Sequence, residues 1–295
     1  MRAEDVEICV GNLARTGGEA AAAYIKRYAH ICELVRVTLQ SEEALSVAAA
    51  SSYFEQISEA LADSYSLTPD KPGFLIKSLQ SYDLPCAAER LRALSGAGGE
   101  ISDYVERGGK EPERPGRISY FKSAAADQAF DIFASRIKDP SLSYGRDFSS
   151  VCEDVYYGRS EFCILPASNS ADGKLPVFYS LAEKYELTGV DECSVTYRDT
   201  ETRFVLFSAS LPRPGGGDSV KLELRMPHGT QTQSVVAAAG YYGLSCDGAD
   251  SMPTEFGTSD MLTFSGTVPS VCDLLFFIQC MQIKYDITGC YAVTA

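Results

Sequence analysis

The sequence predicts a multidomain protein that combines α/β and α+β architecture. Three observations predict this class. Residues 19–107 are alanine-rich and helical in character, residues beyond 116 alternate strand-like and helix-like segments, and residues beyond 217 follow a βαββαβ order. The length of 295 residues gives room for two or three domains. We therefore expect a helical domain over residues 1–112, a single α/β lobe over 113–212 and a smaller α+β domain over 218–295.

The N-terminal domain is predicted to be a bundle of helices. From Glu19 to about Arg107 the chain has amphipathic stretches and few β-branched runs, which favours helix over strand. Pro85 stands where a helix would tolerate proline in its first turn, so a helix is expected to begin there. The charged, proline-rich segment from Gly108 to Gly116 then predicts a linker.

The α/β lobe is predicted from the alternation that follows this linker. Ser150 and Glu153 have the spacing of a capping box, so a short helix is expected to begin at Ser150. Strand, helix and strand in this order predict a parallel sheet with covering helices. The expected elements are strands at 117–121, 142–148 and 162–165 and helices at 124–137 and 175–185.

A hairpin is predicted to end the lobe. Strand-like runs at 189–197 and 202–209 are separated by only four residues, 198–201. The glycine-rich segment 212–217 then predicts a second linker. Beyond it we expect strands at 219–226, 244–251, 259–265 and 285–293 and helices at 230–242 and 269–282, which is the ferredoxin-like order.

The middle of the chain resembles prephenate dehydratases, which convert prephenate to phenylpyruvate in phenylalanine biosynthesis. Asp147–Gly158 is similar to a helix of that family, and Pro166-Ala-Ser-Asn-Ser170 stands in place of its Pro-Ile-Glu-Asn-Ser motif. Thr202-Arg-Phe204 matches the family's Thr-Arg-Phe signature. The resemblance implies a lobe like that of a periplasmic binding protein. It also implies catalytic roles for Thr202, Arg203, Asn169 and Ser170.

The departures from the family pattern bear on activity. Residues 120–124 lack the family's Gly-Pro-x-Gly-Thr turn, and Ser168 replaces the glutamate of Glu-Asn-Ser. The family also places a second α/β lobe between the strands that match 189–197 and 202–209, where this chain has four residues. A single lobe would leave the site open to water, although catalysis on a dicarboxylate needs enclosed, preorganised groups.

Three hypotheses about function follow from this comparison. The first is a catalytically degenerate relative with a binding or regulatory role. The second is an active prephenate dehydratase whose cleft is rebuilt by the N-terminal helices or by a second subunit. The third is a purely structural interaction module, in which Gly229 and Asp250 only shape turns. For the catalytic residues themselves the alternative is that Asn169 and Ser170 cap a helix or close a turn and that Thr202 is simply a strand residue.

The C-terminal segment resembles the ACT domain of the same family. His228-Gly229 precedes a predicted helix where the family has Gly-Ala-Leu, Asp250-Ser-Met-Pro253 aligns with Glu-Ser-Arg-Pro, and Gly289-Cys-Tyr291 is similar to the last strand. The resemblance implies a homodimer that holds a phenylalanine-like amino acid between two ACT domains. The implied ligand-binding residues are Gly229, Thr230, Asp250 and Ser251. An alternative role of Gly229 is to form a tight turn.

Composition and charge argue against several classes of partner. The net charge of −14 opposes nucleic-acid binding. No apolar run approaches the roughly 20 residues of a membrane span, and no secretory signal is visible, so a cytoplasmic protein is expected. The ten cysteines include no Cys-x-x-Cys pair, and His30 and His228 are far apart. We therefore expect structural thiols, no metal site and no cofactor.

Overall fold

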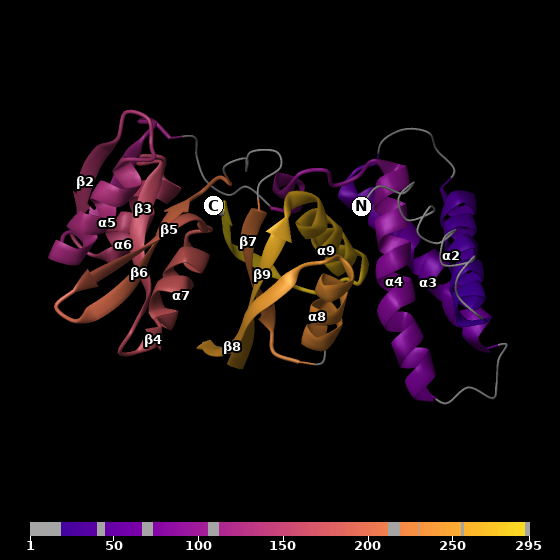
Figure 1. Cartoon of the computed structure of the whole chain (residues 1–295). Helices are drawn as coiled ribbons and strands as arrows, with labels where there is room; N and C mark the ends of the chain where they lie inside the picture. The colour runs from indigo at the N-terminus through magenta and orange to yellow at the C-terminus, as the bar shows by residue number, and fades with distance from the viewer. Residues whose placement is uncertain are drawn as a thin grey trace. The chain divides into compact units, whose positions relative to one another are not determined.

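The computed structural model describes residues 19–39, 45–66, 73–105, 112–211, 219–229, 231–254 and 257–292. The chain divides into two compact units (Figure 1), Met1–Gly99 with Cys272–Ile283 and Glu100–Val271 with Lys284–Ala295. The predicted linker at 212–217 lies outside the described residues, as do residues 108–111 of the predicted linker at 108–116. The mixed α/β class expected from the sequence is confirmed.

The first unit is built from long helices. They are α2 (Glu19–Thr38), α3 (Val47–Ser66) and α4 (Gly73–Ser95), and α4 packs against both of the others. Ile31, Val35, Phe54 and Leu91 are buried between them. Arg92 of α4 forms a 2.6 Å ion pair with Asp273 of the same unit.

The predicted helix start at Pro85 is wrong, because Pro85 lies inside α4. A proline in a helix interior removes one backbone hydrogen bond, so helices usually avoid it. The neighbouring residues Cys86, Ala87 and Ala88 are buried, which indicates that packing holds the helix through this position.

The second unit is built on one continuous β-sheet. Its first part consists of β1 (Arg117–Phe121), α5 (Ala124–Ala134), β2 (Ser141–Gly145), α6 (Phe148–Tyr156), β3 (Phe162–Asn169), β4 (Gly173–Lys174), α7 (Pro176–Lys184), β5 (Thr188–Tyr197) and β6 (Thr200–Ser208), preceded by a short 3₁₀ helix, η1 (Ile101–Tyr104). Its last part consists of β7 (Ser219–Pro227), α8 (Gln231–Tyr241), β8 (Ser245–Thr254), β9 (Gly257–Thr267) and β10 (Asp286–Ala292). Helix α9 (Val268–Cys280) follows β9, and from Cys272 on it belongs to the first unit. The strand order is β2-β1-β3-β6-β5-β10-β7-β9-β8, and β4 pairs with β3.

The predicted βαβ arrangement is confirmed, since β1 pairs in parallel with both β2 and β3. Alternate side chains of these strands are buried on opposite faces of the sheet. Ile164 packs in the cluster that contains α5, whereas Cys163 and Leu165 pack in the cluster that contains α6 and α7. Helices therefore cover both faces, as is usual for a parallel sheet.

The start of α6 differs from the prediction. The N-cap is Asp147, whose carboxylate accepts a hydrogen bond from the backbone N–H of Ser150 at 2.7 Å. Ser150 Oγ in turn accepts from the backbone N–H of Asp147 at 3.1 Å. The predicted capping box of Ser150 and Glu153 is therefore wrong, because Glu153 accepts a hydrogen bond from Tyr185 instead.

The predicted hairpin is confirmed. β5 and β6 pair in antiparallel register, and Tyr197 pairs with Thr200, so only Arg198 and Asp199 form the loop. Both loop residues have positive φ, 48° and 63°, which is the backbone of a tight two-residue hairpin turn. No further element lies between these strands.

The last part of the unit has the predicted ferredoxin-like order. β7 pairs with β10 and β9, and β9 pairs with β8, all antiparallel. β10 also pairs in parallel with β5 at Gly289 and Gly189, which joins the two parts into one sheet. None of the described helices is long and apolar enough to cross a membrane.

Candidate functional site

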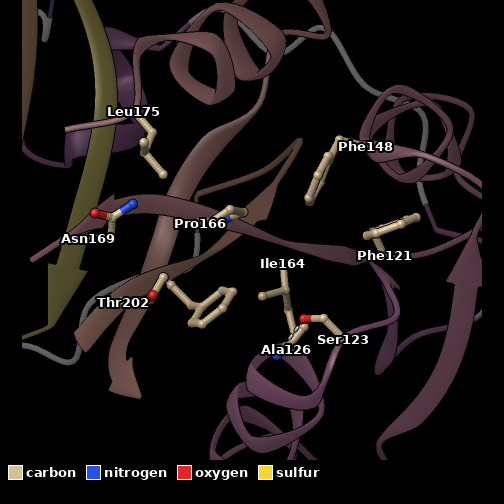
Figure 2. Close-up of a pocket in the computed structure, with 10 residues that line it drawn as sticks. Phe121, Ser123, Ala126, Phe148, Ile164, Pro166, Asn169, Leu175 and Thr202 are labelled. Carbon is tan, nitrogen blue, oxygen red and sulfur yellow. Dashed lines mark hydrogen bonds between the residues drawn. The ribbon is translucent and has the colours of Figure 1, made fainter. Parts of the chain in front are cut away.

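A pocket of about 250 Å³ lies at the carboxyl ends of β1 and β3 (Figure 2). β1 ends at Phe121, and α5 begins immediately afterwards with Ser123 as its N-cap. The helices that follow β1 and β2 lie on opposite faces of the sheet. Ligands of open α/β sheets bind at such a crossing point, so the pocket is the candidate site of this fold.

The lining of the pocket is mostly apolar and aromatic. The apolar lining residues are Phe121, Ala126, Phe148, Ile164, Pro166, Leu175 and Phe204, and the polar ones are Ser123, Asn169 and Thr202. None of these lining residues carries a charge. The ring of Phe148 lies 5.1 Å from that of Phe121 and 4.7 Å from that of Phe178, which makes one wall aromatic.

Two of the predicted catalytic residues meet at this pocket. Asn169 and Thr202 pair across β3 and β6, and both line the cavity (Figure 2). Asn169 Oδ1 accepts hydrogen bonds from the backbone N–H groups of Ala171 and Asp172, at 2.9 and 2.6 Å. Its Nδ2 donates to Asp172 at 3.0 Å, so the amide closes its own turn. Within the described chain, the Thr202 hydroxyl makes no hydrogen bond to another residue.

The other two predicted catalytic residues do not line the pocket. Ser170 connects the turn after β3 to the hairpin, because its backbone N–H donates to Glu201 and its Oγ accepts from Glu201, at 2.8 and 3.1 Å. Arg203 follows Thr202 in an extended strand, so its side chain points to the opposite face of the sheet. The predicted site is thus divided between the two faces.

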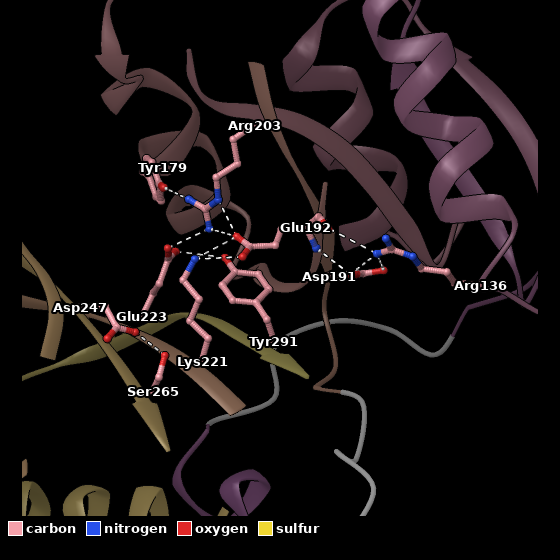
Figure 3. A network of polar contacts seen from close by, with 10 residues as sticks. All are labelled: Arg136, Tyr179, Asp191, Glu192, Arg203, Lys221, Glu223, Asp247, Ser265 and Tyr291. Atoms are coloured by element: carbon pink, nitrogen blue, oxygen red, sulfur yellow. Dashed lines mark hydrogen bonds and ion pairs between the residues drawn. The ribbon is translucent and has the colours of Figure 1, made fainter. Parts of the chain in front are cut away.

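Arg203 instead belongs to a network of ion pairs (Figure 3). Its guanidinium contacts Glu192 at 2.5 Å and Glu223 at 2.8 Å, and it donates to the Tyr179 hydroxyl at 3.3 Å. Lys221 also contacts Glu192, at 2.9 Å, and the Tyr291 hydroxyl donates to Glu223 at 3.0 Å. Because the residues come from β5, β6, β7, β10 and α7, the network fastens the two parts of the sheet together.

In this network the charges of buried side chains are compensated by partners of opposite charge. The side chain of Glu223 is only 2% exposed and that of Arg203 is 18% exposed. Burial would raise the pKa of Glu192, but the charge of Arg203 and the hydrogen bond from Lys221 outweigh it and hold that pKa below its usual range. Burial also raises the pKa of the Tyr291 hydroxyl, which therefore stays a neutral donor. Arg203 is consequently engaged by carboxylates of its own chain.

Three of the four predicted ligand-binding residues of the C-terminal part lie within the described residues. Thr230 lies outside the described residues, and Gly229 is exposed between β7 and α8. Asp250 forms a 2.7 Å ion pair with Lys174, whereas Ser251 donates to Asp260 at 2.9 Å. Neighbouring residues of a strand point to opposite faces, which separates the side chains of Asp250 and Ser251.

A polar cluster around Asp260 was not predicted from the sequence. Asp260 is 6% exposed and accepts hydrogen bonds from Thr232 and Ser251 at 2.7 and 2.9 Å, and His228 Nδ1 lies 2.7 Å from its carboxylate. Burial would raise the pKa of Asp260, but these partners outweigh it and lower the pKa. Two features of the sequence could have indicated this cluster: Asp260 is an acidic residue within an apolar strand, and His228 stands in the segment Pro-His-Gly. The cluster ties the start of α8 to β8 and β9.

Most of the described cysteines are buried in the hydrophobic core. The nine cysteines in the described residues are free thiols, and seven of them are buried. Burial raises the pKa of Cys193 to about 11, which keeps it a neutral thiol. Among the described residues, no group of three or more His, Cys, Asp or Glu side chains is arranged to hold a metal ion.

Comparison with known proteins shows similarity of fold. No protein-family model matches the chain, and no curated protein matches its sequence. The structure of prephenate dehydratase from Streptococcus mutans is similar with a TM-score of 0.51 and 17% identity, over 61% of this chain and 99% of that one. This part of the chain therefore has a prephenate-dehydratase-like fold.

Two further solved structures are less similar. One is a prephenate dehydratase from Arthrobacter aurescens in complex with L-Phe, with a TM-score of 0.48 and 11% identity, over 60% of this chain and 90% of that one. The other is GqqA, described as a novel type of quorum-quenching acylase, with a TM-score of 0.46 and 22% identity, over 60% of this chain and 95% of that one. These two similarities are too weak to indicate an activity.

Proposed function

We propose that the protein is a catalytically degenerate relative of prephenate dehydratase that acts as a binding or regulatory protein. The observation that carries the proposal is the uncharged lining of the pocket, combined with the engagement of Arg203 on the opposite face. Prephenate is a dicarboxylate, and a carboxylate that leaves water without a cationic partner pays a large desolvation cost. The pocket therefore lacks the electrostatic groups that turnover of prephenate would require.

The hairpin supports the same proposal. The family resemblance implies a second lobe between the strands that correspond to β5 and β6, and here these strands are joined by Arg198 and Asp199 alone. A site bounded by one lobe stays open to water, which weakens every electrostatic interaction within it.

The second candidate function is an active prephenate dehydratase with a rebuilt cleft. The observation that favours it is Thr202, the first residue of the intact Thr-Arg-Phe signature, whose hydroxyl faces the pocket without a partner among the described residues. In this case the missing cations would come from another part of the chain or from a second subunit.

A steady-state assay separates the two candidates. We expect the purified protein to form no phenylpyruvate from prephenate, and Thr202→Ala to leave this unchanged. Turnover in the usual enzymatic range of about 1 to 1,000 per second, abolished by Thr202→Ala, would establish the active dehydratase instead. Thr196→Ala is the matched control, because Thr196 lies exposed on the same hairpin outside the pocket.

We propose further that the C-terminal part is an ACT-type domain that binds a phenylalanine-like amino acid in a homodimer. The ferredoxin-like strand order supports this role. β8 lies at the edge of the sheet, and unpaired strand edges favour pairing between subunits. Asp250 stays 54% exposed in its ion pair, so its carboxylate is accessible to a ligand ammonium. We place the protein in the cytoplasm, where buried thiols stay reduced.

Thermal unfolding with each of the twenty amino acids tests the ligand proposal. A ligand at a hundredfold excess over its dissociation constant stabilises the folded state by about 2.7 kcal/mol, which gives a measurable rise in Tm. We expect an aromatic amino acid to raise Tm and Asp250→Ala to reduce that rise. Asp247→Ala, on the same strand, is the control and should retain it. A dimer that no amino acid stabilises would exclude the ligand, and a monomer would exclude the interface as well.

A further inference from the structure

We infer that the pocket binds a small uncharged ring compound that carries one carbonyl or hydroxyl group. This inference rests on the proposed function, because it names the ligand class of a pocket that does not turn over prephenate. It follows from three properties of the pocket: the nature of its walls, the hydrogen-bonding groups that remain free, and its volume.

The walls suit an aromatic or alicyclic ring. Phe121 and Phe148 approach the cavity from the end of β1 and the start of α6, and Leu175 approaches from the start of α7 (Figure 2). Phe121 is 39% exposed although its ring packs against Phe148. A ring placed between these residues would remove their apolar surface from water and stack against aromatic faces.

The polar groups of the pocket suit a neutral ligand. Asn169 is engaged in its own turn, and Ser123 Oγ accepts a hydrogen bond from the backbone N–H of Ala126 at 3.1 Å, which leaves its O–H able to donate. The Thr202 hydroxyl can donate or accept. These hydroxyls can satisfy a carbonyl or hydroxyl oxygen. An anion would find no cation among the lining residues, because Arg203 lies on the other face beside Glu192 and Glu223.

The volume limits the size of the ligand. Pockets for drug-sized ligands typically span about 300 to 1,000 Å³, and this pocket, at about 250 Å³, lies below that range. A single ring with a short substituent fits this space better than a fused ring system or a long chain.

A pair of isosteric probes tests the inference. 2-Phenylacetamide and phenylacetate have the same shape, but only the second is charged. We expect calorimetry or ligand-observed NMR to show the amide binding at least tenfold more tightly than the carboxylate. Equal or tighter binding of phenylacetate, or no binding of the amide at millimolar concentration, would overturn the inference.

Variants then locate the binding site. Thr202→Val removes the hydroxyl and keeps the shape, so we expect about fivefold weaker binding of the amide, the usual effect of one lost hydrogen bond. Leu175→Trp should fill the cavity and abolish binding, with Tm confirming that the variant is folded. Thr196→Val is the matched control and should bind as the wild type does. Amide binding that neither Thr202→Val nor Leu175→Trp alters would place the ligand elsewhere and overturn the inference.

The outcomes separate this inference from the proposed function. If prephenate is turned over, the degenerate role is wrong and the pocket is a catalytic site for an anion. If prephenate is not turned over and the amide fails to bind, the ligand class alone is wrong.

Discussion

Replacing Arg203 with methionine is expected to destabilise the protein by about 3–5 kcal/mol, the usual cost of removing one partner of a buried ion pair. Among the described residues, the Glu223 carboxylate, 2% exposed, would then have only the Tyr291 hydroxyl as a hydrogen-bond donor. Glu192 would keep Lys221 as its ion-pair partner, so its charge would stay compensated. The large effect therefore comes from the uncompensated charge of Glu223.

Chemical denaturation of matched variants measures this effect. Arg198→Met removes an arginine from the same hairpin, but from an exposed position in the turn. The free energy of unfolding of this variant should therefore stay within about 0.5 kcal/mol of the wild-type value. Adding Glu223→Gln to Arg203→Met should recover part of the loss, because the buried charge is removed with its partner. A loss in Arg203→Met no larger than that in Arg198→Met would show that the network is not a structural anchor.

The same network predicts how the difference in stability between wild type and Arg203→Met depends on pH. The pKa of Glu192 is lower in the folded state than in the unfolded state, where a glutamate titrates near pH 4.3. Its contribution to stability is therefore complete above that pH and is lost as the pH falls through the folded-state pKa. The gap between wild type and Arg203→Met should narrow below about pH 4.

Replacing Gly289 with valine is expected to cost about 1–3 kcal/mol, because it overfills the junction between β10 and β5. Gly289 pairs with Gly189 there, and the side chain of Tyr291 occupies the space that both glycines leave open. A Cβ atom on Gly189 would lie 2.6 Å from the Tyr291 hydroxyl and 2.8 Å from Val205, and one on Gly289 would collide with the same tyrosine. Valine would displace Tyr291 and break its hydrogen bond to Glu223.

Gly248→Val is the matched control for this substitution. Gly248 lies in strand β8, and a Cβ atom there would approach nothing closer than 3.7 Å. Its stability should change by no more than about 0.5 kcal/mol. If Gly289→Val unfolds at the same denaturant concentration as Gly248→Val, the junction tolerates a side chain and Tyr291 does not depend on the two glycines.

Local signals predicted most of the fold, and the errors fall where packing overrides them. Alternating apolar residues predicted β1 and the strands of the last part closely, because the side-chain period of a strand is directly visible in a sequence. The start of α4 was misjudged at Pro85, since buried neighbours stabilise a proline that an isolated helix would reject. The cap of α6 was misjudged because Asp147 and Ser150 both fit a cap, and only the backbone decides between them.

The sequence by itself determined the order of strands and helices and the presence of a hairpin between 189 and 209, because these depend on local spacing. The structure shortened the expected four-residue turn to Arg198 and Asp199, and it brought Asn169 and Thr202 together by pairing β3 with β6. The division of Thr202 from Arg203 is also local, since adjacent strand residues face opposite ways. Only the tertiary structure decided which face holds the pocket. It also decided that Glu223, distant in sequence, engages Arg203, because such pairs depend on how strands far apart in the chain are placed side by side.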